Sequence, residues 1–195
     1  AAGALITGGQ GWTLYLTRTL AYQRFLLEQS GGAWNVMTPS PLAAGLVAGL
    51  PHAWAWAMQG LVSASCALAI VVRFRRIKAR GREIGGVDIL LLIAAGFLAA
   101  PYSFNYDMPS LALAIVVAMS EQPSLEADAA WRWGVMALWS APVLMVLIGI
   151  AALIAGVSWA ATGALLVGGG LILPWRGSSR AELDAGTRPV SEGVT

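Results

Sequence analysis

The chain has 195 residues, of which 57% are hydrophobic and 11% charged, and its mean hydropathy is +0.69. A soluble domain carries about a quarter charged residues, so this composition excludes an ordinary soluble protein and predicts an integral membrane protein. A formal net charge of +2 excludes little by itself, and the positions of the charges say more. The single cysteine excludes an intramolecular disulfide. No metal-ligand cluster and no glycine-rich cofactor motif is found in the sequence, so we expect neither a metal nor a cofactor.

Residues 1–50 are predicted to form an extracytoplasmic segment at the membrane interface. Residues 12–30 suit an amphipathic helix, and Gly31-Gly32 would end it because glycine tolerates the left-handed cap. This helix is too polar to span and is expected to lie on the membrane surface as an outer helix. Its apolar side chains fall within one arc at helical spacing: Trp12, Tyr15, Leu16, Leu20, Tyr22, Leu26 and Leu27.

Residues 51–175 are predicted to be a transmembrane helical region. The run from Pro51 to Val72 contains no full charge and is long enough to cross a ~30 Å hydrocarbon core. The stretch R-F-R-R-I-K-A-R-G-R follows, and six cations in ten residues are a strong positive-inside signal. We interpret it as a cytoplasmic topology determinant. Binding of anionic lipid or nucleic acid is the other reading of such a run, and no nucleic-acid partner is expected.

Four further segments complete the prediction. Residues 87–100 and 108–120 are shorter than the usual ~20 residues of a span, so they form two short spans or a re-entrant pair. Either choice returns the chain to the side it left. Residues 133–154, with a kink at Pro142, and residues 157–174 are the last two spans.

The predicted fold class is therefore all-α: a polytopic helical membrane protein with about five membrane segments, two of them short. Residues 176–195 are rich in Ser, Gly, Arg and Glu and are predicted to be a disordered cytoplasmic tail. Counting back from the tail and the basic run places residues 12–50 in a bacterial periplasm. The predicted location is thus the bacterial inner (plasma) membrane, as a multi-pass protein.

The stretch P-Y-S-F-N-Y-D, Pro101 to Asp107, lies between the two short apolar runs. In a structural interpretation Pro101 closes one helix, Asp107 caps the next and the aromatic rings lie at the interface. In a functional interpretation a phenol, an amide and a carboxylate bind a sugar or a polar headgroup beside the lipid. The substrate-binding candidates in this stretch are Tyr102, Asn105, Tyr106 and Asp107.

This stretch resembles the "S/T-P-Y-x-F-D-Y-D" signature of glycosyltransferase family 87, also known as domain-of-unknown-function family 2029. The loop L-L-E-Q-S-G-G-A-W-N-V-M-T-P-S, Leu26 to Ser40, and the order of the later segments are similar to that family as well. The resemblance covers roughly residues 12 to 150. It implies a membrane glycosyltransferase that transfers a hexosyl or mannosyl group from a polyprenyl-phosphate donor on the extracytoplasmic face. Asn105 stands where the family usually has Asp.

The family's general base is a carboxylate in the first outer loop, and we expect this chain to be a C-terminal part that begins after that loop. No catalytic residue is therefore assigned. The resemblance implies that basic residues hold the donor phosphate. Arg24 is the candidate here, and its alternative role is a surface pair with Glu28 at i,i+4.

The expected partners are the polyprenyl-phosphate sugar donor and membrane lipid. The alternative function is a non-catalytic membrane scaffold or a lipid-binding subunit. A transporter or channel is disfavoured, because the predicted spans contain no interior charges and ion or proton routes usually need them.

Overall fold

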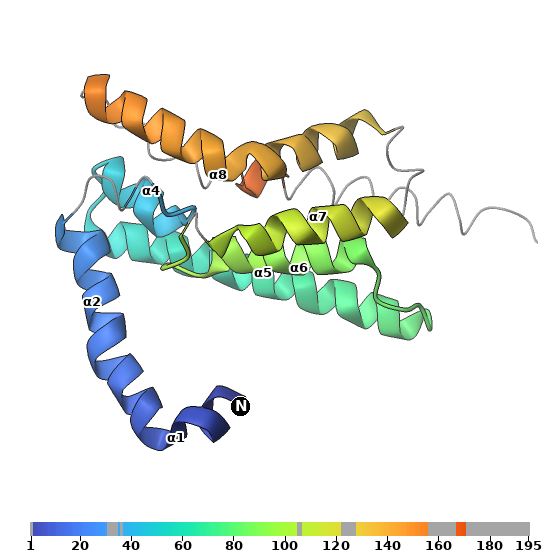
Figure 1. The fold of residues 1–195 in the computed structure, drawn as a ribbon, viewed down its shortest axis with the longest axis horizontal. Helices are drawn as coiled ribbons and strands as arrows, with labels where there is room; N and C mark the ends of the chain where they lie inside the picture. Colours follow the sequence, from blue (N-terminus) through green and yellow to red (C-terminus); the bar gives the residue numbers. More distant parts are fainter. Residues whose placement is uncertain are drawn as a thin grey trace, which may run out of the picture.

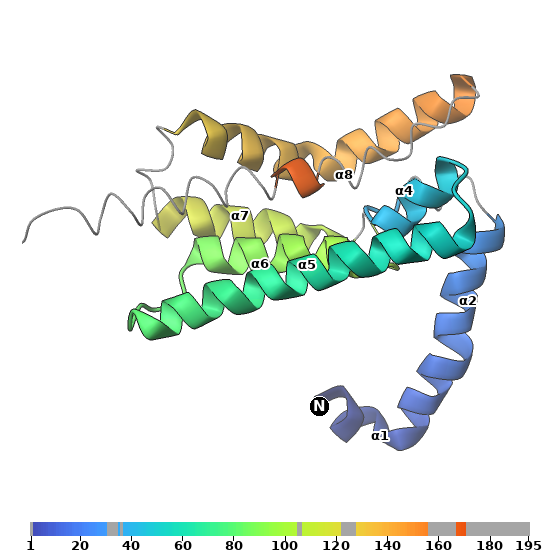
Figure 2. The ribbon, with the colours of Figure 1, turned by 180° about the vertical axis from the view of Figure 1, so that it is seen from behind.

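The computed structural model describes residues 2–30, 35, 37–104, 107–121, 128–155 and 167–170. Within these ranges every regular element is a helix and no strand occurs, which confirms the all-α prediction. Four helices that alternate in direction form the body of the molecule (Figures 1 and 2), and a short helix packs on the first of them. These elements are α4 (Pro41–Val47), α5 (His52–Ala79), α6 (Gly86–Ala99), α7 (Pro109–Glu121) and α8 (Ala129–Ala155).

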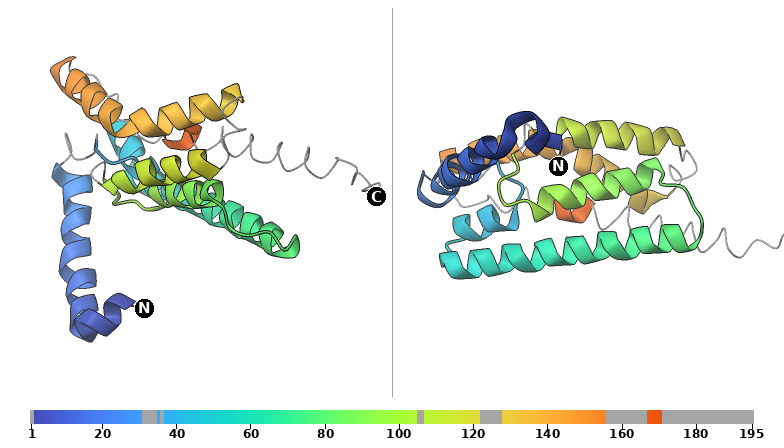
Figure 3. Two further views of the ribbon diagram at one scale, coloured as in Figure 1. Left: turned by 45° about the vertical axis from the view of Figure 1, so that its right-hand side comes forward. Right: turned by 90° about the horizontal axis from the view of Figure 1, so that it is seen from below.

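Residues 2–30 form a separate helical segment, which we call the N-terminal arm. It leaves the body steeply beside the start of α5, as the left view of Figure 3 shows. The predicted helix over residues 12–30 is confirmed, and the helix also extends toward the N-terminus until Gly8 breaks it with a φ of 65°. The arm consists of α1 (Ala2–Leu14), the π-helical turn η1 (Tyr15–Thr19), α2 (Leu20–Phe25) and the π-helical turn η2 (Leu26–Ser30).

Among the described residues, two helices are long and apolar enough to cross a membrane: α5, and α8 over Ala129–Ala151. Only 11% of the apolar stretch of α5 and 33% of that of α8 is buried against the rest of the chain. A helix in the core of a soluble protein would be mostly covered by protein. Large apolar side chains instead face outward, among them Leu61 and Leu68 on α5 and Leu147 on α8. This exposure indicates a membrane protein, because large apolar faces are unfavourable in water and lipid would cover them.

The helices α6 and α7 form a hairpin that agrees closely with the two short runs predicted from the sequence. They contain 14 and 13 residues, and the turn between them lies at the end of the body where α5 begins (Figure 1). Together with α8 they enclose the main core, in which Leu90, Leu111 and Trp131 are almost fully buried. Of the fifth predicted segment, 157–174, the structure describes residues 167–170, which are helical, and the predicted tail lies outside the described residues.

The helix α8 contains Pro142 and is bent along its length (Figures 1 and 2). Proline lacks the backbone N–H that would bond one turn back, and its ring crowds the carbonyl there. The kink predicted at Pro142 therefore has its usual physical cause.

One buried side chain, Gln59 of α5, joins three helices at the level of the α6–α7 turn. Its Oε1 accepts a hydrogen bond from the N–H of Leu42 in the first turn of α4 at 3.0 Å. Its Nε2 donates to the carbonyls of Leu98 and Ala99 at the end of α6, at 3.0 and 3.1 Å. These are helix-end groups without a partner in their own helix, so one amide satisfies the ends of two helices.

The opposite end of α5 carries the cationic run, and the helix continues through this run to Ala79. Arginine and lysine are good helix formers. Asp88, in the first turn of α6, is fully buried and bonds Arg73 at 2.7 Å and Arg82 at 2.9 Å. Two of the six cations are therefore held by one carboxylate, which fastens the start of α6 to α5.

Candidate functional site

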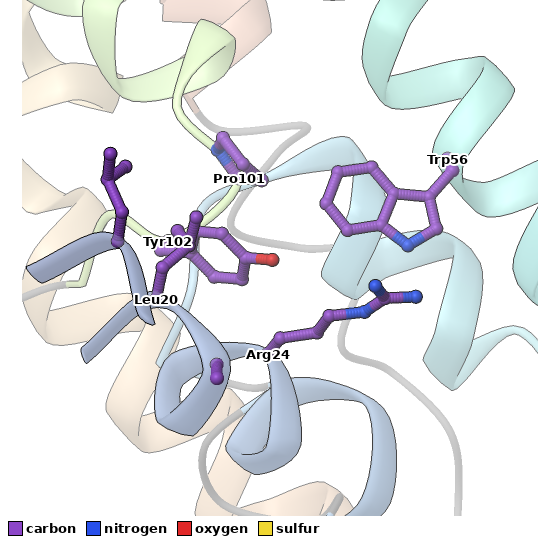
Figure 4. Close-up of a pocket in the computed structure, with 7 residues that line it drawn as sticks. Leu20, Arg24, Trp56, Pro101 and Tyr102 are labelled. Atoms are coloured by element: carbon purple, nitrogen blue, oxygen red, sulfur yellow. The ribbon is translucent and has the colours of Figure 1, made fainter. Parts of the chain in front are cut away.

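A pocket of about 670 Å³ lies where the N-terminal arm, the start of α5 and the α6–α7 turn meet. Figure 4 shows the labelled side chains around it: the hydroxyl of Tyr102 points toward the space between Trp56 and Arg24. The pocket is at the end of the body away from the cationic run. Its lining residues come from three separate parts of the chain: Leu16, Leu20, Ala21, Arg24, Trp56, Pro101 and Tyr102.

The side of the pocket formed by α5 is held in place by a small apolar cluster. Leu27 of the arm, Leu42 and Ala43 of α4, and Ala55 of α5 are buried together, and Trp56 and Tyr102 pack on this cluster. The start of α4 is fixed by Ser40, whose Oγ accepts from the N–H of Ala43 at 3.2 Å. Trp56 is thus presented to the pocket by packing on its other side.

The turn that carries Tyr102 is fixed by its own polar groups. The hydroxyl of Ser103 donates to the carbonyls of Phe97 and Ala100, at 2.9 and 3.2 Å. The carboxylate of Asp107 accepts from the N–H of Phe104 at 3.1 Å, and the Phe104 ring is buried. The backbone on both sides of Tyr102 is therefore tied down, which sets the direction of the phenol.

Two of the lining residues, Arg24 and Trp56, are joined by the carboxylate of Glu28, which does not itself line the pocket. Its Oε1 accepts from the Nε of Arg24 and from the indole Nε1 of Trp56, both at 2.9 Å. The ring of Trp56 also meets that of Tyr102 edge to face, with centroids 6.3 Å apart and planes at 68°. The arm, α5 and the turn are joined through this one chain of contacts.

Exposure shows which of these charges remains available to a ligand. The side chain of Glu28 is only 10% exposed and already receives two donors, whereas that of Arg24 is 62% exposed. Only the Nε of Arg24 bonds Glu28, so the terminal nitrogens of the guanidinium face the pocket and solvent. These nitrogens are the donors that suit phosphate or carboxylate oxygens.

The surroundings of Tyr102 favour the neutral form of its phenol. Burial raises the pKa of Tyr102, the nearby charge of Glu28 raises it further, and the charge of Arg24 acts in the opposite direction. A neutral phenol keeps its O–H and can both donate and accept a hydrogen bond. The pocket thus combines a cation, a phenol and an indole ring on an apolar lining.

The structure brings together two of the predicted substrate-binding residues, Arg24 and Tyr102. The alternative role of Arg24, an ion pair with Glu28, is also observed. Asp107 does not line the pocket. Its carboxylate accepts from the N–H of Phe104, in the turn before it, and not from the N–H groups at the start of α7. Asn105 and Tyr106 lie outside the described residues.

Two residues of the site were missed by sequence reasoning. The sequence suggests no binding role for Trp56, and for Glu28 it suggests only the pair with Arg24. A weak signal existed for Glu28, because it follows Leu26 and Leu27, and a carboxylate beside buried apolar side chains is expected to find a donor. No spacing in the sequence connects Glu28 to Trp56.

Within the described part of the chain, no group of three or more His, Cys, Asp or Glu side chains is placed to hold a metal ion. The carboxylates near the pocket are bonded to arginine, tryptophan and backbone groups. Comparison with family models, with curated proteins and with solved structures finds no match to this chain.

Proposed function

We propose that the chain is part of a multi-pass membrane glycosyltransferase of the bacterial plasma membrane that uses a polyprenyl-phosphate sugar. The pocket is proposed to receive the donor's headgroup on the extracytoplasmic side. The observation that carries the proposal is the presence of Arg24, Tyr102 and Trp56 around one pocket at the end of the body opposite the cationic run. By the positive-inside rule that end faces away from the cytoplasm.

Each part of such a donor finds a matching group in the pocket. The open face of the Arg24 guanidinium suits the phosphate. The aromatic rings of Trp56 and Tyr102 suit the apolar face of a sugar, and the Tyr102 hydroxyl suits one of its oxygens. Leu16 and Leu20 line the pocket on the arm and suit the first isoprene units.

The proposed reaction is the transfer of a hexosyl or mannosyl group to an acceptor hydroxyl. The acceptor oxygen bonds to the anomeric carbon, the bond from that carbon to the phosphate oxygen breaks, and polyprenyl phosphate leaves. A base takes the hydroxyl proton. The carboxylate of Glu28 is 10% exposed and its Oε1 already accepts from Arg24 and Trp56, so the base is proposed to be a different carboxylate, in the first outer loop that the resemblance to glycosyltransferase family 87 implies.

A second candidate function is a lipid-binding subunit without catalysis. It is favoured by the state of the carboxylates: Glu28 is committed to two donors, and Asp107 bonds the turn away from the pocket. A pocket built in this way binds an anionic headgroup but offers no free base among the described residues.

The test uses the complete reading frame in membranes with a polyprenyl-phosphate mannose or glucose donor. Arg24→Ala is expected to raise the KM for the donor by tenfold or more, since a charge-assisted hydrogen bond is worth about 1.5–3 kcal/mol. Arg18→Ala is the matched control, because Arg18 is exposed on the same arm and does not line the pocket.

Sugar transfer that responds to Arg24 and not to Arg18 supports the enzyme. Donor binding that responds in the same way, without any transfer, supports the lipid-binding subunit. If neither binding nor transfer changes in Arg24→Ala, the pocket is not the donor site.

A further inference from the structure

The outward face of α5 changes character along its length in a way that the pocket does not explain. Leu61, Leu68, Val71, Arg75 and Lys78 follow one another at steps of seven, three, four and three residues, which keeps them on one side of a helix. All five are exposed. The face is apolar for most of the helix and becomes cationic in its last two turns.

The opposite side of the same turns faces the body. Arg73 and Ile77 are buried, and Arg73 bonds Asp88. Because Asp88 is already shared by Arg73 and Arg82, it does not neutralise the outer cations. The side chain of Glu121 accepts from the N–H of Gly86, and that of Asp128 accepts from the N–H groups of Ala130 and Trp131.

Arg75 and Lys78 therefore have no ion-pair partner within the part of the chain that the structure describes. Glu83 is exposed in the loop after α5 and makes no ion pair there either. Lys78 lies in the last turn of α5, where a cation is favoured by the helix dipole, but the dipole does not account for Arg75.

We propose that this face of α5 binds an anionic phospholipid of the leaflet at the cationic end. Arg75 and Lys78 hold the headgroup phosphate, and an acyl chain lies along Val71 and Leu68. Leu68 is about 10 Å along the helix axis from Arg75, a distance that an acyl chain covers easily. The site is separate from the pocket and does not depend on the proposed enzyme.

The continuity of the face selects a lipid over other anions. A free phosphate would use the cations and leave the leucines uncovered. A nucleic acid would need cations spread over a polar surface, whereas this cationic patch adjoins a helix long and apolar enough to cross a membrane. A phospholipid has a phosphate and a hydrocarbon chain in the same order as the cations and the leucines.

The test measures binding of phosphatidylglycerol and phosphatidylcholine to the detergent-solubilised chain by native mass spectrometry. Unmodified protein is expected to bind phosphatidylglycerol more tightly. A cation close to an anionic membrane surface contributes about a fivefold gain in affinity, so Arg75→Gln with Lys78→Gln should weaken phosphatidylglycerol binding by roughly 20-fold. The charge-retaining pair Arg75→Lys with Lys78→Arg should keep most of the binding, which also guards against a folding defect in the first pair.

A matched control removes two charges elsewhere: Arg18→Gln with Arg132→Gln, both of which are exposed. It should bind phosphatidylglycerol like the unmodified protein. Leu68→Ala should weaken the binding of phosphatidylglycerol while leaving the affinity for inorganic phosphate unchanged.

Three results would each overturn the proposal. The first is equal binding of the two lipids by the unmodified protein. The second is the same loss in the matched control as in the Arg75/Lys78 pair. The third is displacement of bound phosphatidylglycerol by inorganic phosphate or by a duplex oligonucleotide as effectively as by added phosphatidylglycerol.

Discussion

The indole N–H of Trp56 donates to the carboxylate of Glu28 at 2.9 Å, and this bond ties the start of α5 to the N-terminal arm. The same oxygen receives the Nε of Arg24. The arm otherwise meets the body mainly through Leu27, because most of its large apolar side chains are exposed. The position of the arm, and with it the shape of the pocket, therefore depends strongly on one carboxylate.

Replacing Glu28 should loosen the arm. In Glu28→Ala the indole N–H and the guanidinium both lose their acceptor, and the loss of such bonds costs about 1–3 kcal/mol. Hydrogen exchange of the backbone amides in residues 20–29 should become faster, while exchange in α6 and α7 should stay the same. Trp56→Phe removes only one of the two donors and should give a smaller effect in the same segment. Unchanged exchange in both variants would mean that packing alone holds the arm.

The phenol of Tyr102 should lose its proton at a higher pH than the phenol of an exposed tyrosine. Its pKa is raised by burial and by the charge of Glu28, so the folded state binds the proton more tightly than the unfolded state. The stability that this provides is complete below about pH 10, the ordinary tyrosine value, and is lost as the pH rises through the raised pKa.

The measurement is an ultraviolet titration of tyrosinate absorbance, compared with that of Tyr102→Phe. The difference in absorbance between the two proteins, which reports Tyr102 alone, should have its midpoint above pH 10. Glu28→Gln should shift this midpoint toward lower pH. A difference curve centred at or below pH 10 would contradict the prediction.

Gln59→Leu should destabilise the body strongly. The substitution removes the side-chain partner of the Leu42 N–H and of the Leu98 carbonyl, whereas the Ala99 carbonyl keeps the Ser63 hydroxyl as a donor at 2.8 Å. Each unsatisfied buried group costs about 1–3 kcal/mol. Thermal unfolding in detergent or in lipid nanodiscs measures the effect. The control is Ser65→Ala, since the Ser65 hydroxyl bonds only the carbonyl of Leu61 in its own helix. Equal melting temperatures in the two variants would show that Gln59 does not join the helices.

Two glycines of α6 should respond in opposite ways to alanine. A Cβ on Gly86 would lie 2.8 Å from the Cα and the N of Ala118, and backbone atoms of α7 cannot move aside without separating the hairpin. A Cβ on Gly96 would meet nothing within 4 Å. Gly86→Ala is therefore expected to lower the melting temperature, whereas Gly96→Ala should raise it slightly, because alanine is favoured over glycine in a helix by about 1 kcal/mol. A neutral Gly86→Ala would mean that the hairpin packs less closely than described.

The helices were predictable because their signals are local. The run from 87 to 100 corresponds to α6 (Gly86–Ala99), and the run from 108 to 120 to α7 (Pro109–Glu121), since apolar composition and the flanking prolines fix both. The apolar run from Pro51 to Val72, predicted to cross the membrane, lies almost entirely within α5, and the helix extends beyond it. The cations continue it to Ala79, with Arg73 buried against Asp88.

The site was only half predictable. Arg24 and Tyr102 stand out in the sequence as a cation in an apolar arm and a phenol in a proline turn. Their meeting depends on how the arm packs on α4 and α5, which no local pattern records. Asp107 shows the same limit: its carboxylate is suited to cap a following helix, yet it bonds the preceding N–H of Phe104 because the turn folds back on itself.

The helices of the hairpin are much shorter than their neighbour. With 14 and 13 residues, α6 and α7 extend about 20 Å each, whereas the 28 residues of α5 extend about 42 Å. The apolar part of α5, from His52 to Val72, matches a hydrocarbon layer of ~30 Å, whereas the hairpin is about 10 Å too short for it. In the proposed membrane protein the lipid beside the hairpin must therefore thin. In the proposed orientation the pocket, which adjoins the α6–α7 turn, then lies below the surrounding headgroups, within reach of molecules that diffuse sideways in the bilayer. A host membrane with shorter acyl chains should suit this protein better than a thick one.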